Sequence, residues 1–257
     1  MMEIRLISSM LEVGDNMPLT KKQQEQYFHT TFLKEIGEEG QLKLLHSKVA
    51  VVGCGGLASS ALIYLTSIGV GHITIIDDDV VSLSNLPRQN LFTYDECGKL
   101  KVDVAKDRLE RINPDVTINA INLRLKEDNA EELLKGHDVV LDCTDNFETK
   151  FLINDTCQKL NITYVIAGVR DYQGQVLTCI PNKTKDFKSL FSTLPINIDE
   201  KVKKADQGVF PMSVGVIADI AAAEVIKILL NIGELLTDKL LVINLLKNQY
   251  QIIDLSK

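Results

Sequence analysis

The chain has no tryptophan, and its five cysteines are scattered, with none of them in a C-x-x-C pair. This usage is typical of reduced thiols and argues against a disulfide framework or a zinc knuckle. The first 26 residues are mixed and polar, so they lack the apolar core of a signal peptide. The most apolar late segment, residues 214–232, includes Asp219, Glu224 and Lys227, which predicts a buried helix rather than a membrane span. We therefore expect a cytoplasmic protein that does not enter a membrane.

The sequence also has fewer positively than negatively charged side chains. The sequence has 28 lysines and arginines against 35 aspartates and glutamates, which gives a net charge of -7. This balance disfavours nucleic acid and anionic membranes as partners, and plain solubility explains it. With 257 residues and 45% apolar side chains, the chain is long enough for one large α/β domain or two small ones.

The middle of the sequence alternates between strand and helix patterns. Strands are predicted at residues 48–52, 73–77, 116–125, 137–142 and 163–169, and helices at residues 57–68, 99–112, 128–135 and 147–160. This alternation favours a parallel, doubly wound sheet. Two further helices are predicted before the first strand, at residues 21–31, with Thr20 as the cap, and at residues 38–45.

The pattern changes after the last of these strands. A strand at residues 174–180 precedes a long, lysine-rich and aperiodic stretch at residues 181–208, which is followed by a helix at residues 213–230. A connection of that length is a functional lid, a crossover or a disordered segment. Two final strands, residues 239–245 and 249–254, are expected to form a hairpin. The predicted fold class is therefore α/β, a Rossmann-like, doubly wound and mostly parallel sheet with antiparallel strands at its C-terminal end.

A glycine-rich turn, Gly53-Cys54-Gly55-Gly56, lies between the first predicted strand and a helix rich in small residues. Such a turn lets backbone amides and a helix N-terminus approach a phosphate chain. About twenty residues later, the second strand ends in Asp77-Asp78-Asp79, where a carboxylate would accept hydrogen bonds from ribose hydroxyls. Together these features predict a nucleotide site. The glycine turn alone would also fit a nicotinamide-dependent dehydrogenase.

Three more patches follow, close to where a parallel sheet binds its ligands. Asn85 and Arg88 lie in the turn after the second strand, where they can clamp phosphate oxygens. Lys101 is at the start of a predicted helix, and Asp145 follows the strand at residues 137–142. Asp145 can hold magnesium, which takes few protein carboxylates and completes its shell with water and phosphate.

Each of these residues also has a structural interpretation. Asp145 can cap the helix that follows it. Lys101 can be a solvated helix charge, and Arg88 can pair with Asp95. The order of the three patches along successive elements favours one shared site over three separate coincidences.

Five stretches of the sequence resemble the MoeB/ThiF/HesA family, the bacterial relatives of ubiquitin-activating enzymes. They are Gly53-Cys54-Gly55-Gly56-Leu57, residues 79–89, Lys99-Leu100-Lys101, Ile112-Asn113-Pro114 and Asp142-Cys143-Thr144-Asp145-Asn146. The resemblance runs from about Tyr27 to the C-terminus. It therefore implies an N-terminal extension at residues 1–26 and a single adenylation domain at residues 27–257, with a crossover loop at residues 181–208.

The activity that this resemblance implies is the ATP- and magnesium-dependent adenylation of a C-terminal carboxylate, with release of pyrophosphate. The substrate would be a ubiquitin-like sulfur carrier protein of thiamine or molybdenum-cofactor synthesis. One alternative is the adenylation of a ribosomal peptide in natural-product biosynthesis. Another is a non-catalytic, nucleotide-binding partner subunit.

The resemblance also implies roles for individual residues. Those expected to hold the nucleotide are Gly53, Gly55, Gly56, Asp77, Asp79, Asn85, Arg88, Lys101, Asp145 and Asn146. Asp79 is preferred over Asp77 for the ribose, and Asp145 is expected to bind magnesium. Arg88, Lys101 and Asp145 form the catalytic set, because cations and a metal must neutralise the charge that develops when a carboxylate attacks a phosphate.

The sequence departs from the family pattern in its N-terminal segment. The family sends an arginine from this segment into the neighbouring ATP site of a dimer, and His29 stands at that position here. A histidine cannot form the two-pronged contacts of a guanidinium. This leaves three alternatives. A nearby lysine such as Lys34 takes the place of the arginine, a different partner subunit supplies the arginine, or the activity is weak.

Cysteine usage departs from the family pattern as well. The zinc-binding C-x-x-C pairs are absent, so no zinc is expected. The crossover loop has no cysteine for a covalent step, and Lys204 lies near that position. The nearest thiol is Cys179, which is expected to be buried and inert in an apolar strand. The lysines of the loop either contact the tail of the carrier or form a solvated surface.

Overall fold

The computed structural model describes residues 17–191 and 208–256. The chain forms two compact units, one that ends at Lys43 and one that begins at Leu44. The first unit contains α2 (Lys21–Gln26) and α3 (Phe28–Thr31), and α4 (Gly37–His46) spans the boundary between the units. As predicted, Thr20 caps α2, and its side chain accepts a hydrogen bond from the Gln23 amide.

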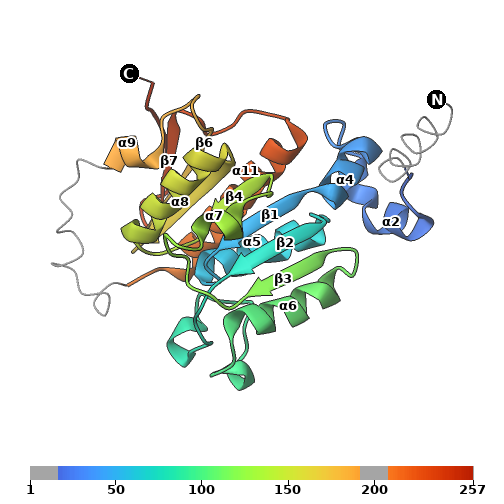
Figure 1. The fold of residues 1–257 in the computed structure, drawn as a ribbon, viewed down its shortest axis with the longest axis horizontal. Helices are drawn as coiled ribbons and strands as arrows, with labels where there is room; N and C mark the ends of the chain where they lie inside the picture. The colour runs from blue at the N-terminus through green and yellow to red at the C-terminus, as the bar shows by residue number, and fades with distance from the viewer. Residues whose placement is uncertain (1–16, 192–207, 257) are drawn as a thin grey trace. The chain divides into compact units, whose positions relative to one another are not determined.

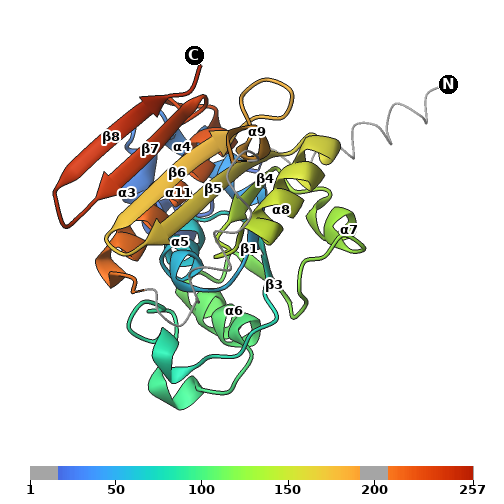
Figure 2. The same cartoon turned by 90° about the vertical axis from the view of Figure 1, so that its left-hand side faces the viewer.

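The second unit is built on one eight-stranded sheet with the strand order β3-β2-β1-β4-β5-β6-β7-β8 (Figure 1). The strands are β1 (Lys48–Val52), β2 (His72–Ile76), β3 (Thr117–Ile121), β4 (Val139–Asp142), β5 (Thr163–Arg170), β6 (Gln173–Cys179), β7 (Lys239–Asn244) and β8 (Gln249–Asp254). The first five run parallel, and the last three pair antiparallel at one end of the sheet (Figure 2). The predicted fold class is confirmed, including the C-terminal hairpin.

Helices cover both faces of this sheet (Figure 1). One face carries α5 (Gly56–Ser67), α6 (Lys101–Ile112) and α11 (Pro211–Leu230), and the other carries α7 (Ala130–Leu134) and α8 (Phe147–Leu160). Ala58 and Ala61 on α5, and Ala218 and Ala221 on α11, are almost completely buried, and such small side chains let the two helices approach each other closely. Within the described ranges, no helix has both the length and the apolar character needed to cross a membrane.

The direction of the strand order reverses at β1, which pairs with β2 on one side and β4 on the other. In an open α/β sheet the loops that follow such a pair of strands diverge and leave a crevice at their carboxyl ends. Gly53 follows β1 with a φ of +89°, and a Cβ atom there would lie 3.0 Å from the Cys143 carbonyl oxygen. The loops after β1 and β4 therefore approach each other at the floor of this crevice.

Three local predictions were wrong. The helix expected at residues 21–31 is interrupted at Tyr27, whose carbonyl accepts hydrogen bonds from both Thr30 and Thr31 and starts a new turn. The strand expected at residues 116–125 ends at Ile121, because its neighbour β2 ends at the paired position. A short helix, α9 (Phe187–Phe191), lies in the stretch expected to be aperiodic. The remainder of that stretch, residues 192–207, lies outside the described residues.

A histidine just before β4, His137, links fold stability to pH. His137 Nδ1 lies 3.0 Å from the Leu134 carbonyl oxygen, and Nε2 lies 2.9 Å from Thr74 Oγ1. Burial lowers the pKa of this imidazole below its ordinary value of 6.5. The folded state therefore favours the neutral ring, and this contribution to stability is present above about pH 6.5 and is lost as the pH falls toward the lower folded-state pKa.

We expect urea unfolding to show a fall in the free energy of unfolding as the pH drops below about 6.5. The variant His137→Gln should show a smaller fall, because its amide does not gain a proton. The variant His72→Gln, at an exposed position on β2, serves as the control. An unchanged pH dependence in His137→Gln would contradict the assignment to this ring.

Candidate active site

The glycine turn between β1 and α5 is packed so closely that side chains are excluded from it. A Cβ atom on Gly56 would lie 2.9 Å from Val214 Cγ1 and 3.1 Å from the Arg88 carbonyl oxygen. Gly55 is the N-cap of α5 and provides no side-chain hydrogen bond to the first turn of the helix. The amides at the start of α5 are therefore available to an anion, which is the arrangement that binds phosphate.

Asp77, at the end of β2, holds this turn in place. Its Oδ2 accepts a hydrogen bond of 2.6 Å from the Cys54 amide, and its Oδ1 accepts one of 2.8 Å from the Asp79 amide. Burial raises the pKa of the Asp77 carboxyl above its ordinary value. Both carboxylate oxygens are engaged by the backbone, which leaves Asp79 as the better candidate for the ribose.

Lys101 is the first residue of α6, and only 5% of its side chain is exposed. Its Nζ donates a hydrogen bond of 2.9 Å to Oδ2 of Asp79, a side chain that is 69% exposed. The alternative interpretation of Lys101 as a solvated helix charge was therefore wrong. A largely buried ammonium group lies beside the end of β2, and its ion partner is at the surface.

The loop that carries Asn85 and Arg88 contains a short 3-10 helix (Leu83–Asn85). The Arg88 guanidinium donates a hydrogen bond of 3.1 Å to the Ser84 carbonyl, while Asp95 accepts one from Thr93. Among residues 17–191 and 208–256, no ion pair joins Arg88 to Asp95, so that alternative was also wrong. The backbone of Arg88 lies close to Gly56, so this loop packs beside the glycine turn.

Sequence reasoning did not assign a role to Gln89, which the structure brings to the turn. Its side chain is buried, and its Oε1 has no hydrogen-bond partner among the described residues. Its Nε2 lies 3.6 Å from the position that a Cβ atom of Gly55 would occupy. A buried amide oxygen without a partner is costly, so this group indicates a place that a ligand or water completes. The signal in the sequence was its position directly after Arg88.

Two carboxylates, one at the end of β4 and one in the loop that follows it, have different surroundings. Asp142 is fully buried; its Oδ1 accepts hydrogen bonds from the Thr144 amide and hydroxyl, and its Oδ2 lies 3.1 Å from Lys150 Nζ in an ion pair. Asp145 is exposed. The N-cap of α8 is Asn146, whose side chain accepts a hydrogen bond of 2.9 Å from the Thr149 amide.

The alternative interpretation of Asp145 as the helix cap was therefore wrong. An exposed carboxylate at this edge of the sheet suits magnesium, which takes its other ligands from water and phosphate. In the described ranges, the one group of three acids close enough to share a metal ion is Asp77, Asp78 and Asp79, and it does not include Asp145. Two members of that group are already bonded to protein atoms.

The cysteines of the second unit are mostly buried. Cys179 has no exposed surface, which confirms that it is buried as expected, and this burial raises the pKa of its thiol to about 12. Burial likewise raises the pKa of Cys54, beside the glycine turn. Of the other positions discussed from the sequence, His29 lies in α3 with its ring 5.4 Å from that of Phe28, and Lys204 lies outside the described residues.

Residues 27–257 match the family model described as the ThiF family. The chain is 37% identical over 227 residues to a SAMP-activating enzyme E1 of Haloferax volcanii, with 88% of this chain and 83% of the relative covered. It is 35% identical over 240 residues to a sulfur carrier protein adenylyltransferase of Thermus thermophilus, covering 91% of this chain and 88% of that protein.

A relative from Gracilaria tenuistipitata is 33% identical over 237 residues, which is 92% of this chain, but the chain spans only 66% of that relative's length. Among solved structures, the fold is similar to that of E. coli MccB with MccA-N7isoASN. The TM-score is 0.81 at 25% identity, and the match covers 94% of this chain and 74% of that one.

The close packing around Gly56 leads to a test of the phosphate turn. Gly56→Ala would push a methyl group against Val214 and the Arg88 backbone. We expect it to weaken the binding of a non-hydrolysable ATP analogue by about tenfold or more in calorimetry, or ~1.4 kcal/mol. Gly215→Ala is the matched control, because a Cβ atom there meets nothing within 4 Å. Equal affinities for the two variants would show that the turn does not contact the nucleotide.

Proposed function

Because the chain belongs to the ThiF family, we propose that it is an adenylyltransferase. It binds ATP at the carboxyl ends of β1, β2 and β4 and activates the C-terminal carboxylate of a ubiquitin-like sulfur carrier protein. The names of two relatives at 35–37% identity, a SAMP-activating enzyme and a sulfur carrier protein adenylyltransferase, support this substrate class.

The observation that carries the proposal is the contact of separate segments around one glycine turn. A Cβ atom on Gly53 would touch Cys143, in the loop that leads to Asp145, and one on Gly56 would touch Arg88. The Cys54 amide is bonded to Asp77, two residues before the partner of Lys101. These contacts support the proposal that the residues expected to bind phosphate, ribose and metal belong to one site.

The residues of this site suit nucleotide transfer. An oxygen of the carrier's carboxylate forms a bond to the α-phosphorus of ATP, the bond from that phosphorus to the bridging oxygen breaks, and pyrophosphate leaves. Two anions approach each other in this step, so Arg88 and Lys101 stabilise the charge that develops on the phosphates. Magnesium held by Asp145 would neutralise more of that charge when bound. Positioning supplies most of the remaining rate, and no protein nucleophile is needed.

The site residues that we assign to the nucleotide comprise the predicted set and Gln89. Gly53, Gly55 and Gly56 admit the phosphates, Asp79 takes the ribose, and Asn85 and Asn146 border the triphosphate. Asp77 acts by holding the turn. We assign no zinc, because the sequence has no C-x-x-C pair.

The protein would act in the cytoplasm as a homodimer, or together with a partner subunit that supplies an arginine to the site. This assignment follows from the family pattern, in which an arginine occupies the position of His29.

A peptide with a free C-terminus is the second candidate substrate. It is favoured by the absence of cysteine from residues 181–208. Family members that go on to form a thioester or persulfide with the carrier have a cysteine in this loop. A non-catalytic role as a nucleotide-binding partner is less well supported, because the relatives at 35–37% identity are named as an activating enzyme and an adenylyltransferase.

ATP–pyrophosphate exchange tests the proposed activity directly. We expect exchange in the presence of small carrier proteins that end in Gly-Gly and none with carriers that lack these two residues. Exchange with peptides alone would establish the second candidate. Nucleotide binding without exchange for any carrier or peptide would identify a binding subunit and overturn the proposal.

The metal role of Asp145 has its own test. Asp145→Ala should lower the exchange rate by about a hundredfold or more, because charge neutralisation by a bound metal is worth several kcal/mol. Its effect on thermal stability should be small, since the side chain is exposed and Asn146 provides the cap. Glu148→Ala, at an exposed position in the first turn of α8, is the control. An unchanged rate in Asp145→Ala would remove the metal from this position.

A further inference from the structure

The short helix α9 packs against the first turns of α8 through an aromatic cluster. The ring of Phe187 lies 4.5 Å from that of Phe191 and 5.9 Å from that of Phe147, measured between centroids. Phe191 also contacts Phe147 at 6.3 Å, and Phe151 contacts Phe187 at 5.4 Å. Phe187 is almost fully buried, so this contact is part of the core on the α8 side of the sheet.

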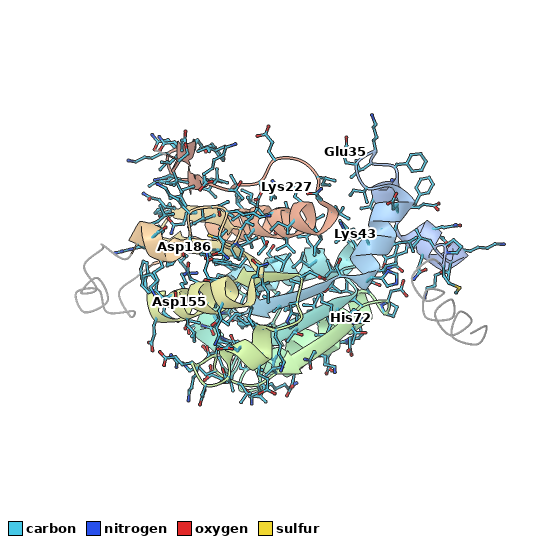
Figure 3. All side chains as sticks on the ribbon, turned by 45° about the horizontal axis from the view of Figure 1, so that its top comes forward. Glu35, Lys43, His72, Asp155, Asp186 and Lys227 are labelled. Carbon is cyan, nitrogen blue, oxygen red and sulfur yellow. The ribbon has the colours of Figure 1, made fainter. Side chains whose placement is uncertain are left out.

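Polar contacts fix α9 to α8 as well. Asp186 Oδ1 accepts a hydrogen bond of 2.8 Å from the Ser189 amide, and its Oδ2 lies 3.4 Å from the Asn154 and Gln158 amide nitrogens. Lys188 Nζ pairs with Asp155 Oδ2 at 2.6 Å. Figure 3 shows Asp155 and Asp186 on the same side of the molecule, at the α8 and α9 ribbons. The segment is therefore docked at several points along α8.

The aromatic cluster reaches the candidate site through Phe147. This residue is the first of α8 and follows Asn146, the N-cap, and Asp145, the assigned metal ligand. On the inner side, the Asp142–Lys150 ion pair holds the same turn, and Lys150 also donates a hydrogen bond to the Ala167 carbonyl. The turn is therefore restrained on its inner side by the ion pair between Asp142 of β4 and Lys150 of α8, and on its outer side by α9.

We propose that α9 is a positioning element for the candidate site: Phe187 and Phe191 hold Phe147, and through it they fix the Asp145–Asn146 turn at the end of β4. The proposal rests on the proposed function for its catalytic consequence, but its structural part does not. Ordinary core packing would make every apolar side chain of α9 matter to a similar degree. A positioning role instead makes the rings that touch Phe147 specifically important for that turn.

Phe191→Ala and Leu190→Ala form a matched pair for the test. Both residues are on α9, both are partly buried, and both pack against the same apolar cluster, but only Phe191 has a ring in contact with Phe147. Hydrogen–deuterium exchange of the full chain should show faster exchange of the Thr149 amide, which is bonded to Asn146, in Phe191→Ala. The rate should be unchanged in Leu190→Ala.

In the exchange assay, Phe191→Ala should raise the magnesium concentration for half-maximal rate several-fold, while the affinity for ATP without metal stays near that of the unaltered chain. Phe191→Tyr, which keeps the ring, should restore the original magnesium dependence. Equal changes in the two alanine variants, or no change at Thr149, would overturn the positioning role. If the unaltered chain shows no pyrophosphate exchange, the proposed function fails, while the amide measurement still decides the structural claim.

Discussion

The candidate site depends on one partly buried carboxylate. Asp77 accepts hydrogen bonds from the Cys54 and Asp79 amides, so it joins the glycine turn after β1 to the loop after β2. Burial raises the pKa of the Asp77 carboxyl, which means that folding works against its charged form. The geometry of the site is thus maintained at some cost to stability.

The same arrangement recurs at the end of β4. Asp142 is buried and bonded to its own loop, whereas Asp145, three residues later, is exposed. In both places one acid, Asp77 or Asp142, accepts hydrogen bonds from backbone amides. A second acid, Asp79 or Asp145, follows it and is exposed. This division explains how a sheet edge can present negative side chains to a metal or a ribose while its polypeptide keeps a fixed shape. A single acid in each loop would have to serve both purposes.

Much of this was predictable from the sequence, because it depends on local patterns. The alternation of strand and helix patterns predicted the parallel sheet, and the glycine turn predicted where the candidate site lies. The features that the sequence could not predict depend on contacts between residues that are distant in the chain. The burial of Lys101 requires the contact with Asp79, and the role of Asn146 as cap rather than Asp145 depends on the direction in which the chain leaves β4. The docking of α9 likewise depends on rings from another helix.

The first turn of α5 begins at a glycine and has no side-chain cap. An anion that binds there would accept hydrogen bonds from these amides in place of water, so ligand binding would also stabilise the start of this helix. By linkage, a ligand that binds only the folded chain adds RT ln(1 + [L]/Kd) to the free energy of unfolding, roughly 2.7 kcal/mol at a hundredfold excess over Kd. The lifetime of the folded protein against proteolysis then rises with the concentration of any such ligand.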